Sequence, residues 1–461
     1  MDYIELLNNY IDRQGLSKNT LIGRTGIDRS TFFQILNRKR VATSDQFYKI
    51  LTQINLTAAE QSSIMEAFEK EKLGDSIWYE KDFVRKMLKV ISTVNENNKS
   101  LGLEVKFKED TSDYKKCYSG NEVAEIIKRL ASREILNTEN GEIDIFMPIS
   151  LLYEMDLFLY MDTITNGVDY RNIKIKQLIE YPIKTMEFND SNITMLSSYL
   201  MFLLTNRFDY IAGTYYVGGD IGSSIGAIFP YYIQVSDFVL MIDSSGKEAV
   251  LVEDAEIRSK MKELFDASFE KALPLVSGFD SKEEYVKLIG SYPHKKLYIS
   301  ERKPGVSFLY SEEFLNKYIP EHMQPWVKSH CEAFINREYV EYVSPEGLKE
   351  FAMSGEINEA GFELKGSSAD VKIILDILKS RLHETLEIVN DEVFPLSQNW
   401  SISVVENEFI TLVPYLSNDR IIFISEKNIV RAFTEYFEQI NDTDAILGTE
   451  EIGEIFAGLS V

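Results

Sequence analysis

Apolar residues recur at helical spacing through the first fifty residues, and capping residues and a glycine divide them into short segments. Ser17 precedes one segment and Asp28 the next, and both residue types commonly cap a helix N-terminus. Gly26 lies between these segments, where it favours a turn. The inward positions are those of Tyr3, Leu6, Leu7, Tyr10, Leu21, Ile22, Phe32, Ile35, Leu36, Phe47, Ile50 and Leu51. The pattern predicts a small all-α bundle that contains a helix-turn-helix.

Residues 16–40, which read LSKNTLIGRTGIDRSTFFQILNRKR, resemble the Cro/C1-type (XRE) family of helix-turn-helix transcriptional regulators. The resemblance covers roughly residues 3–70. In this family the helix after the turn enters the major groove of DNA, and the preceding helix crosses the backbone. The resemblance implies a bacterial DNA-binding protein that regulates transcription.

The resemblance also implies which residues read the bases. The base-facing positions fall on Arg29, Ser30 and Gln34, with Thr31 nearby. An Arg side chain can donate two hydrogen bonds to guanine, a Gln side chain can pair with adenine in the same way, and hydroxyl groups adapt to either. We therefore expect sequence-specific contacts from this helix.

A second set of positions matches the family's phosphate contacts, which position the protein without reading sequence. These positions fall on Asn37, Arg38, Lys39 and Arg40. Lys18 stands where the family usually has Gln, so we expect it to contact phosphate more than base.

Three residues of the head depart from the family pattern. Arg38 replaces a usual Gly, and Phe33 and Leu36 take places that are commonly polar, so these two could face a partner. The alternative interpretation of the whole head is a small helical bundle whose Arg and Lys side chains form a solvated face.

Charge is distributed unevenly along the chain. Residues 1–50 contain eight Lys and Arg against five Asp and Glu, a net charge of +3, so the other 411 residues carry −27 of the total of −24. The negative total argues against wholesale binding to nucleic acid or anionic membrane, whereas the basic segment indicates a local site for a polyanion. We expect an acidic body that repels DNA and leaves binding to the head.

The pattern after the head changes from helical to mixed. Helical stretches such as 121–133 and 193–204 alternate with β-rich runs such as 143–149, 210–217 and 231–235. The predicted fold class is therefore an all-α helix-turn-helix head followed by a mixed α/β body of two modules. The predicted divisions are a DNA-binding domain at 1–74, a helical linker at 75–110 whose best linker segment is 95–113, module 1 at 111–277 and module 2 at 278–461.

Two segments of the body match each other at an offset of 172 residues. Phe238-Val-Leu240, Val250-Leu-Val252, Ile257, Met261 and Phe265 correspond to Ile410-Thr-Leu412, Ile422-Phe-Ile424, Ile429, Phe433 and Phe437. Both segments read as strand, strand, short acidic turn and helix, and both follow a Phe-Pro pair, at 229–230 and at 394–395. We predict two related modules with a cleft between them for a small ligand, against the alternative that apolar strands match by chance.

The head followed by a long α/β region with a Pro-Tyr-Tyr-Ile motif at 230–233 is loosely similar to uncharacterised regulators of low-GC Gram-positive bacteria. That resemblance implies no particular ligand.

No catalytic constellation emerges from the sequence. The glycine-rich stretch 218–226 has neither GxGxxG spacing nor a terminal Gly-Lys-Ser/Thr, so we interpret it as a turn. His294-Lys-Lys296-Leu-Tyr-Ile-Ser-Glu301 has the spacing of a phospholipase D HxKxxxxD motif with Glu in place of Asp, but no second copy stands at the repeat offset. His322, His330 and Cys331 are interpreted as packing on a helix rather than as a metal site. We expect no enzyme activity, no cofactor and no metal.

Cysteine usage and the absence of targeting patterns favour the cytoplasm. Cys117 and Cys331 are far apart and have no CxxC spacing, so no disulfide framework is predicted. The first residues lack the basic and apolar regions of a signal peptide, and the longest apolar stretch, 199–205, is far shorter than the ~18 residues that a spanning helix needs. We expect a cytoplasmic protein without a membrane partner.

Together these observations predict a sequence-specific transcriptional regulator that binds double-stranded operator DNA. A homodimer is expected because pseudo-palindromic operators require paired heads. The body would sense a small-molecule or peptide effector or hold two heads together. Two alternatives remain: a degenerate phospholipase D-like or nucleotide-handling enzyme with a DNA-targeting head, in which His294 would act, and a protein-interaction module.

Overall fold

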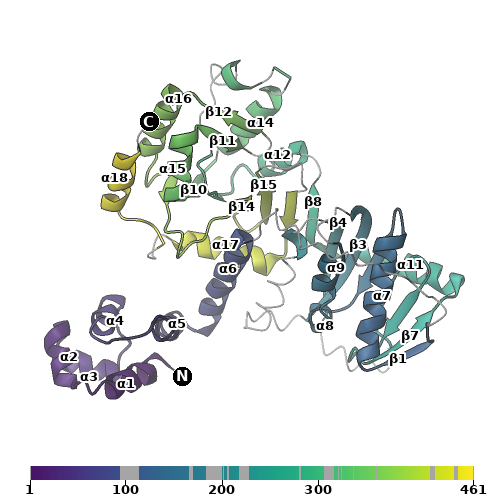
Figure 1. The fold of residues 1–461 in the computed structure, drawn as a ribbon, viewed down its shortest axis with the longest axis horizontal. Coiled ribbons are helices and arrows are strands. Elements are labelled where there is room, and N and C mark those ends of the chain that lie inside the picture. The colour runs from purple at the N-terminus through teal and green to yellow at the C-terminus, as the bar shows by residue number, and fades with distance from the viewer. Residues whose placement is uncertain are drawn as a thin grey trace. The chain divides into compact units, whose positions relative to one another are not determined.

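A computed structural model describes the greater part of the chain as two compact units (Figure 1). One unit consists mainly of Met1–Phe83, and the other consists mainly of the residues from Val84 onward. The described residues are 2–93, 114–165, 170–182, 200, 202–204, 207–217, 228–279, 282–305, 316–319, 321–322, 324–335, 337–359, 362–415, 421–440 and 445–459. The predicted linker segment 95–113, the glycine-rich stretch 218–226 and most of the predicted helix 193–204 lie outside them.

The head is helical, as predicted. Its helices are α1 (Tyr3–Arg13), α2 (Lys18–Thr25), α3 (Arg29–Leu36), α4 (Ser44–Leu51) and α5 (Ala58–Leu73), followed by α6 (Asp75–Thr93), which runs into the second unit. Their core centres on Tyr3, Phe47 and Phe68, with the rings of Phe47 and Phe68 stacked at 3.9 Å between centroids. Apolar spacing in the sequence thus identified the buried side of each helix.

The body is a mixed α/β structure, which confirms the predicted class at that level. Its first half contains β1 (Cys117–Ser119), α7 (Asn121–Asn137), β2 (Glu142–Phe146), α8 (Ile149–Glu154), α9 (Leu157–Thr165), β3 (Tyr170–Pro182), β4 (Phe208–Val217), β5 (Tyr231–Gln234), β6 (Val239–Ile242), β7 (Glu248–Val252) and α11 (Ala255–Phe269). Its second half contains β8 (Leu273–Phe279), α12 (Lys282–Gly290), β9 (Leu297–Ser300), α14 (Gln324–Ile335), β10 (Tyr339–Val343), α15 (Pro345–Ser354), β11 (Glu356–Glu359), β12 (Phe362–Lys365), α16 (Ser368–Ser380), β13 (Leu386–Ile388), β14 (Trp400–Val405), β15 (Phe409–Pro414), β16 (Ile421–Ile424), α17 (Lys427–Glu438) and α18 (Thr449–Gly458). The predicted boundary between residues 277 and 278 falls inside β8.

One long sheet runs through the body. Over the described ranges it contains fourteen strands in the order β1-β7-β6-β5-β2-β3-β4-β8-β16-β15-β14-β9-β10-β13, and β11 pairs with β12 separately. β4 and β8 join the two halves as an antiparallel pair, with Ala212 opposite Val276.

The first seven strands of this order and the last seven have the same chain connectivity. β2, β3 and β4 are parallel neighbours, as are β9, β10 and β13. β5, β6 and β7 extend the first set as antiparallel neighbours, and β14, β15 and β16 extend the second in the same way. β1 and β8 complete the two sets by pairing antiparallel with β7 and β16.

The pairing corrects the predicted 172-residue correspondence by one residue at its first strand. Val239 pairs with Val252, whereas Ile410 pairs with Ile424, so Ile410 stands in the place of Val239 rather than of Phe238. The second hairpin is one residue longer between its paired positions, which shifts the first strand only. Both strands are apolar on both faces, so alternation in the sequence could not fix the register.

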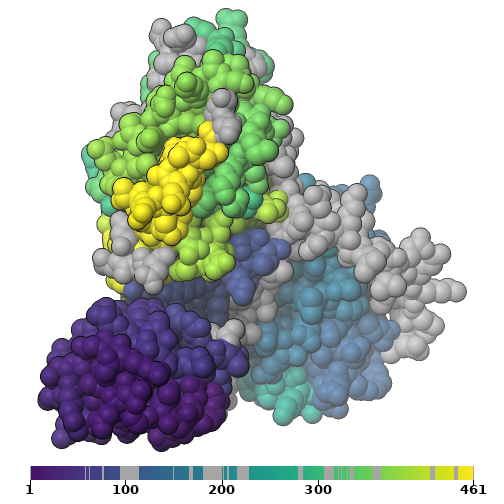
Figure 2. Space-filling model, turned by 60° about the vertical axis from the view of Figure 1, so that its left-hand side comes forward, coloured from purple at the N-terminus to yellow at the C-terminus, as the bar shows by residue number. Residues whose placement is uncertain are grey.

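Helices cover both faces of the sheet, because alternate side chains of a strand point in opposite directions. Leu297 and Ile299 of β9 pack in one cluster with Tyr285 of α12. Tyr298, between them, contacts Phe437 of α17 with ring centroids 5.7 Å apart. At the C-terminus, α18 lies on the outside of the body, where Ile452 packs against α15 and α16 (Figure 2).

Candidate nucleic-acid interface

The two helices of the predicted helix-turn-helix are bounded by the caps that the sequence indicates. The Ser17 hydroxyl accepts a hydrogen bond from the Thr20 amide at 3.1 Å, and the Asp28 carboxylate accepts one from the Thr31 amide at 3.1 Å. Gly26 ends α2 in the left-handed region at φ 68°, which glycine adopts without steric cost. These local bonds fix where α3 begins and so which side chains its first turn presents.

The predicted base-reading residues lie on the solvent side of α3. Arg29, Ser30 and Gln34 are exposed and Thr31 is half-buried, while Phe32 and Ile35 face the core. The Arg29 guanidinium carbon lies 5.8 Å from the centre of the Phe33 ring, one helical turn further on. The ring thereby holds the cation near the N-terminal end of the helix.

The predicted phosphate-contacting residues 37–40 are all exposed, and they follow α3 in a well-defined C-terminal motif. The Arg38 amide donates to the Ile35 carbonyl at 3.0 Å, and the Lys39 amide donates to the Gln34 carbonyl at 2.8 Å. Together these bonds form a Schellman motif with Arg38 at its left-handed position, φ 59°. This backbone conformation explains why a glycine is usual at that place in the family that the head resembles.

The expectation that Phe33 and Leu36 face a partner is wrong for Leu36. Its side chain is 4% exposed and belongs to the core of the head, because it follows Phe32 by one helical turn. Phe33 is half-buried beneath Arg29.

The basic side chains of the head fall into two groups. Arg13 forms an ion pair with Glu60, Arg38 with Asp2 and Lys49 with Asp45. Within the described part of the chain, the cations of α2, of the first turn of α3 and of the loop that follows it form no ion pair; they are Lys18, Arg24, Arg29, Lys39 and Arg40. Arg24, in the last turn of α2, was not among the predicted contacts and adds a cation to this set.

The phospholipase D-like motif does not assemble in this half of the sheet. His294 precedes β9 and is exposed, whereas Glu301 follows the same strand and accepts a hydrogen bond from Ser401 at 2.9 Å. Seven residues along an extended strand separate the two side chains by roughly 20 Å. Lys296 is paired with Glu338 at 2.9 Å.

The histidines and cysteines do not form a metal centre in the ranges that the structure describes, where no group of three or more His, Cys, Asp and Glu could hold an ion. Cys117 is exposed, Cys331 is buried, and both are free thiols. Across the same ranges, no helix is both long enough and apolar enough to cross a membrane.

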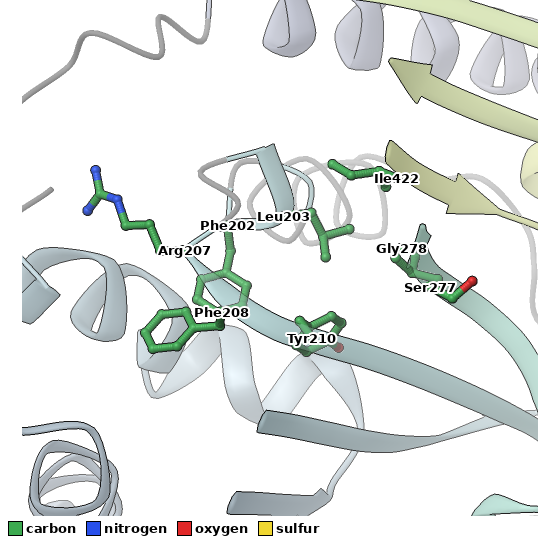
Figure 3. Close-up of a pocket in the computed structure, with 9 residues that line it drawn as sticks. Phe202, Leu203, Arg207, Phe208, Tyr210, Ser277, Gly278 and Ile422 are labelled. Carbon is green, nitrogen blue, oxygen red and sulfur yellow. The ribbon is translucent and has the colours of Figure 1, made fainter. Parts of the chain in front are cut away.

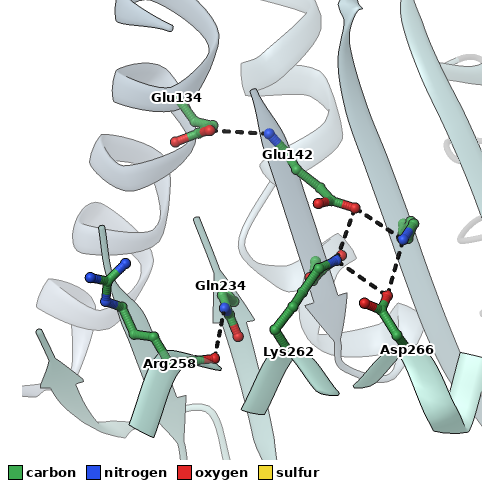
Figure 4. A network of polar contacts seen from close by, with 8 residues as sticks. Glu134, Glu142, Gln234, Arg258, Lys262 and Asp266 are labelled. Atoms are coloured by element: carbon green, nitrogen blue, oxygen red, sulfur yellow. Dashed lines mark hydrogen bonds and ion pairs between the residues drawn. The ribbon is translucent and has the colours of Figure 1, made fainter. Parts of the chain in front are cut away.

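A charged cluster that the sequence analysis missed fixes α11 to the first half of the sheet (Figure 4). The Lys262 ammonium lies 2.7 Å from the Asp144 carboxylate, 2.9 Å from Glu142 and 3.2 Å from Asp266. Lys176 completes the cluster, at 3.0 Å from both Glu142 and Asp266. Three carboxylates thus share two ammonium groups across β2, β3 and α11.

Burial raises the pKa of Asp144 to about 6, although Lys262 opposes the rise. Partial burial also acts to raise the pKa of Glu142, but hydrogen bonds from Lys262 and Lys176 outweigh it and leave that pKa below its usual range. The signal in the sequence was a charged residue inside an apolar run, Ile143-Asp144-Ile145, which a buried strand accepts only when the charge is paired.

The expected cleft between the two halves is occupied by side chains where the described strands meet. A pocket at β4, β8 and β16 is lined by Phe202, Phe208, Tyr210, Gly278 and Ile422, among others (Figure 3). Its volume of about 20 Å³ leaves room for about one water molecule. This pocket is therefore too small for an organic effector.

Comparisons with known proteins leave the chain without a family. No family model matches it, and no curated protein matches it. A solved structure of TrmBL2, an archaeal chromatin protein described as showing a novel mode of DNA binding, is similar at 13% identity over 53% of this chain and 81% of that one, with a TM-score of 0.24. A likeness of this size carries no argument for the fold or the function of this chain.

Proposed function

We propose that the chain is a sequence-specific DNA-binding regulator whose head inserts α3 into the major groove. The observation that carries this proposal is the group of unpaired cations on α2, α3 and the following loop, beside the exposed side chains of Arg29, Ser30 and Gln34. Cations without an intramolecular partner are available to phosphate, and exposed Arg and Gln on a capped helix suit the reading of base edges.

The acidic body supports a division of labour within this proposal. Its charge of −27 over 411 residues repels DNA, so that the head alone would supply affinity. A homodimer follows from the proposal, because a pseudo-palindromic operator requires two heads about one helical turn apart.

We also infer that the body consists of two related modules, near 111–277 and 278–461. The repeated strand order supports this inference. So do the caps of α11 and α17: Asp254 accepts from the amides of residues 256 and 257, and Glu426, 172 residues later, accepts from those of 428 and 429. Duplicated modules are a common basis for ligand sensing, which is the role that we propose for the body.

The experiment that tests DNA binding is the salt dependence of affinity for a random duplex. Each phosphate contact releases counterions, so the logarithm of affinity should fall linearly with that of salt concentration. Lys39→Ala should reduce the slope by about 1. The matched control is Lys49→Ala, because Lys49 is exposed on α4 and paired with Asp45 at 2.8 Å; it should leave the slope unchanged. A salt-independent interaction would favour a protein-binding head instead.

A further inference from the structure

The strand register identifies equivalent positions in the two halves of the body. In the first half, Leu178 pairs with Phe146 and Phe146 with Tyr232. In the second half, Tyr342 pairs with Ser300 and Ser300 with Ile402. Leu178 therefore corresponds to Tyr342, Phe146 to Ser300 and Tyr232 to Ile402.

The helices on this face correspond as well. The N-caps of α11 and α17 are 172 residues apart, which places Met261 in register with Phe433, Leu264 with Tyr436 and Phe265 with Phe437. The two halves can thus be compared side chain by side chain at the same place between helix and sheet.

In the second half this place is filled by Phe394. Its side chain is fully buried, and its ring centroid lies 5.6 Å from that of Tyr342, 6.1 Å from Tyr436 and 5.5 Å from Phe437. A phenyl ring supplied by the chain itself completes the packing between α17 and the sheet.

In the first half the same place is a cavity of about 480 Å³, a size typical of small-molecule sites. Leu178 and Leu264, which correspond to the neighbours of Phe394, line it together with Phe146, Tyr232 and Met261. Leu264 is 53% exposed, so apolar surface that its counterpart buries is left open to solvent. The Pro-Tyr-Tyr-Ile motif at 230–233 supplies Tyr232 to this wall.

The rim of the cavity carries one positive charge. Lys271 lines it, is exposed, and forms no ion pair with any residue that the structure describes. Ser268, also exposed, lines the cavity from the last turns of α11. The charged cluster of Asp144 and Lys262 lies on the same face, because Asp144 precedes Phe146 by two residues on β2.

We propose that this cavity binds a small organic anion that carries an aromatic ring. The ring would occupy the place that Phe394 fills in the second half, and the anionic group would pair with Lys271. The inference deepens the proposed function, since it names the class of effector that the body would sense. Binding is measured without DNA, so failure here and failure of DNA binding are distinguishable.

The test uses the fluorescence of 8-anilinonaphthalene-1-sulfonate, an aromatic anion, titrated into the full-length chain. The wild type should bind one molecule saturably. Ser268→Phe, which places a ring in the cavity, should weaken binding by about tenfold or more. Ala267→Phe is the matched control, because Ala267 is exposed on the same helix and does not line the cavity; it should bind like the wild type.

Charge is tested separately, so that the proposal stays falsifiable if Ser268→Phe does not fold. Lys271→Glu should weaken binding several-fold, and Lys247→Glu, at an exposed lysine in the β6–β7 turn, should not. 1-Naphthaleneacetate should displace the probe, and its neutral amide should not.

Several outcomes would overturn the proposal. Unchanged binding by folded Ser268→Phe would exclude the cavity as the site. Non-saturable uptake of many probe molecules would show surface adsorption only. Equal displacement by the acid and the amide, or equal effects of the two lysine variants, would exclude the anionic contact.

Discussion

Asp2 and Arg38 form an ion pair at 2.5 Å that joins the start of α1 to the loop after α3. Arg38 is one of the residues expected to contact phosphate, so an intramolecular carboxylate competes with DNA for its guanidinium group. Asp2 also caps α1, where its side chain accepts a hydrogen bond from the Glu5 amide at 2.8 Å.

Asp2→Asn separates these two roles, because Asn caps a helix as well as Asp does. We expect the variant to bind all DNA sequences more tightly and to raise the salt slope by up to about 1, with little change in stability. Fluorescence anisotropy at several salt concentrations measures both quantities. Asp45→Asn frees Lys49 on α4 in the same way and is the control; an equal gain from that variant would mean that general charge, rather than Arg38, is responsible.

Specificity should depend on the exposed side of α3. Arg29→Ala and Gln34→Ala should each weaken binding to the preferred site by roughly 1–3 kcal/mol while barely changing binding to random DNA. Lys39→Ala should weaken both alike, because phosphate contacts carry no sequence information. Competition binding against random duplex measures the ratio. Equal losses on both DNAs for every variant would refute the assignment of the base-reading residues.

Two glycines of the predicted helix-turn-helix should respond oppositely to alanine. Gly26 has φ 68°, whereas Gly23 lies inside α2, and an added Cβ meets no atom within 4 Å at either position. Backbone conformation alone therefore decides the sign. Gly26→Ala should destabilise the head by about 1 kcal/mol, and Gly23→Ala should stabilise it by about 0.5–1 kcal/mol.

Amide hydrogen exchange of α1 to α4 in the full-length chain reports these changes locally. Destabilisation by both substitutions would show that α2 does not end at Gly26 in solution.

The caps of the head could be predicted because they depend on neighbours in sequence. Ser17, Gly26 and Asp28 each act within a few residues, and their roles follow from backbone chemistry. The pairing of Ala212 with Val276 depends instead on segments far apart in the chain, and no local pattern encodes it.

The cavity beside α11 was equally hidden from the sequence. The Phe-Pro pair at 394–395 fills the second half with the Phe394 ring, and the matching pair at 229–230 precedes β5 at a different spacing from the sheet. Apolar composition is alike in both halves, so only side-chain packing distinguishes the filled place from the open one. The paired charges of Asp144 and Lys262, 118 residues apart, are a further long-range contact.

Asp144 should make stability depend on pH. Because its pKa in the folded chain, about 6, lies above the ordinary value, the protonated carboxyl favours the folded state. That contribution is fully present below the ordinary pKa and is lost as pH rises through 6. Between pH 5 and 7.5, the wild type should therefore lose about 1 kcal/mol of stability relative to Asp144→Asn. Urea unfolding of the full-length chain at both values measures the difference, and parallel pH dependences would contradict it.

The central claim, that the head reads a DNA sequence, is tested most directly by selecting bound duplexes from a random pool with the full-length protein. The account predicts enrichment of a pseudo-palindromic motif whose half-sites lie about 10 base pairs apart from centre to centre. Recovery of a pool no different from the input would contradict it.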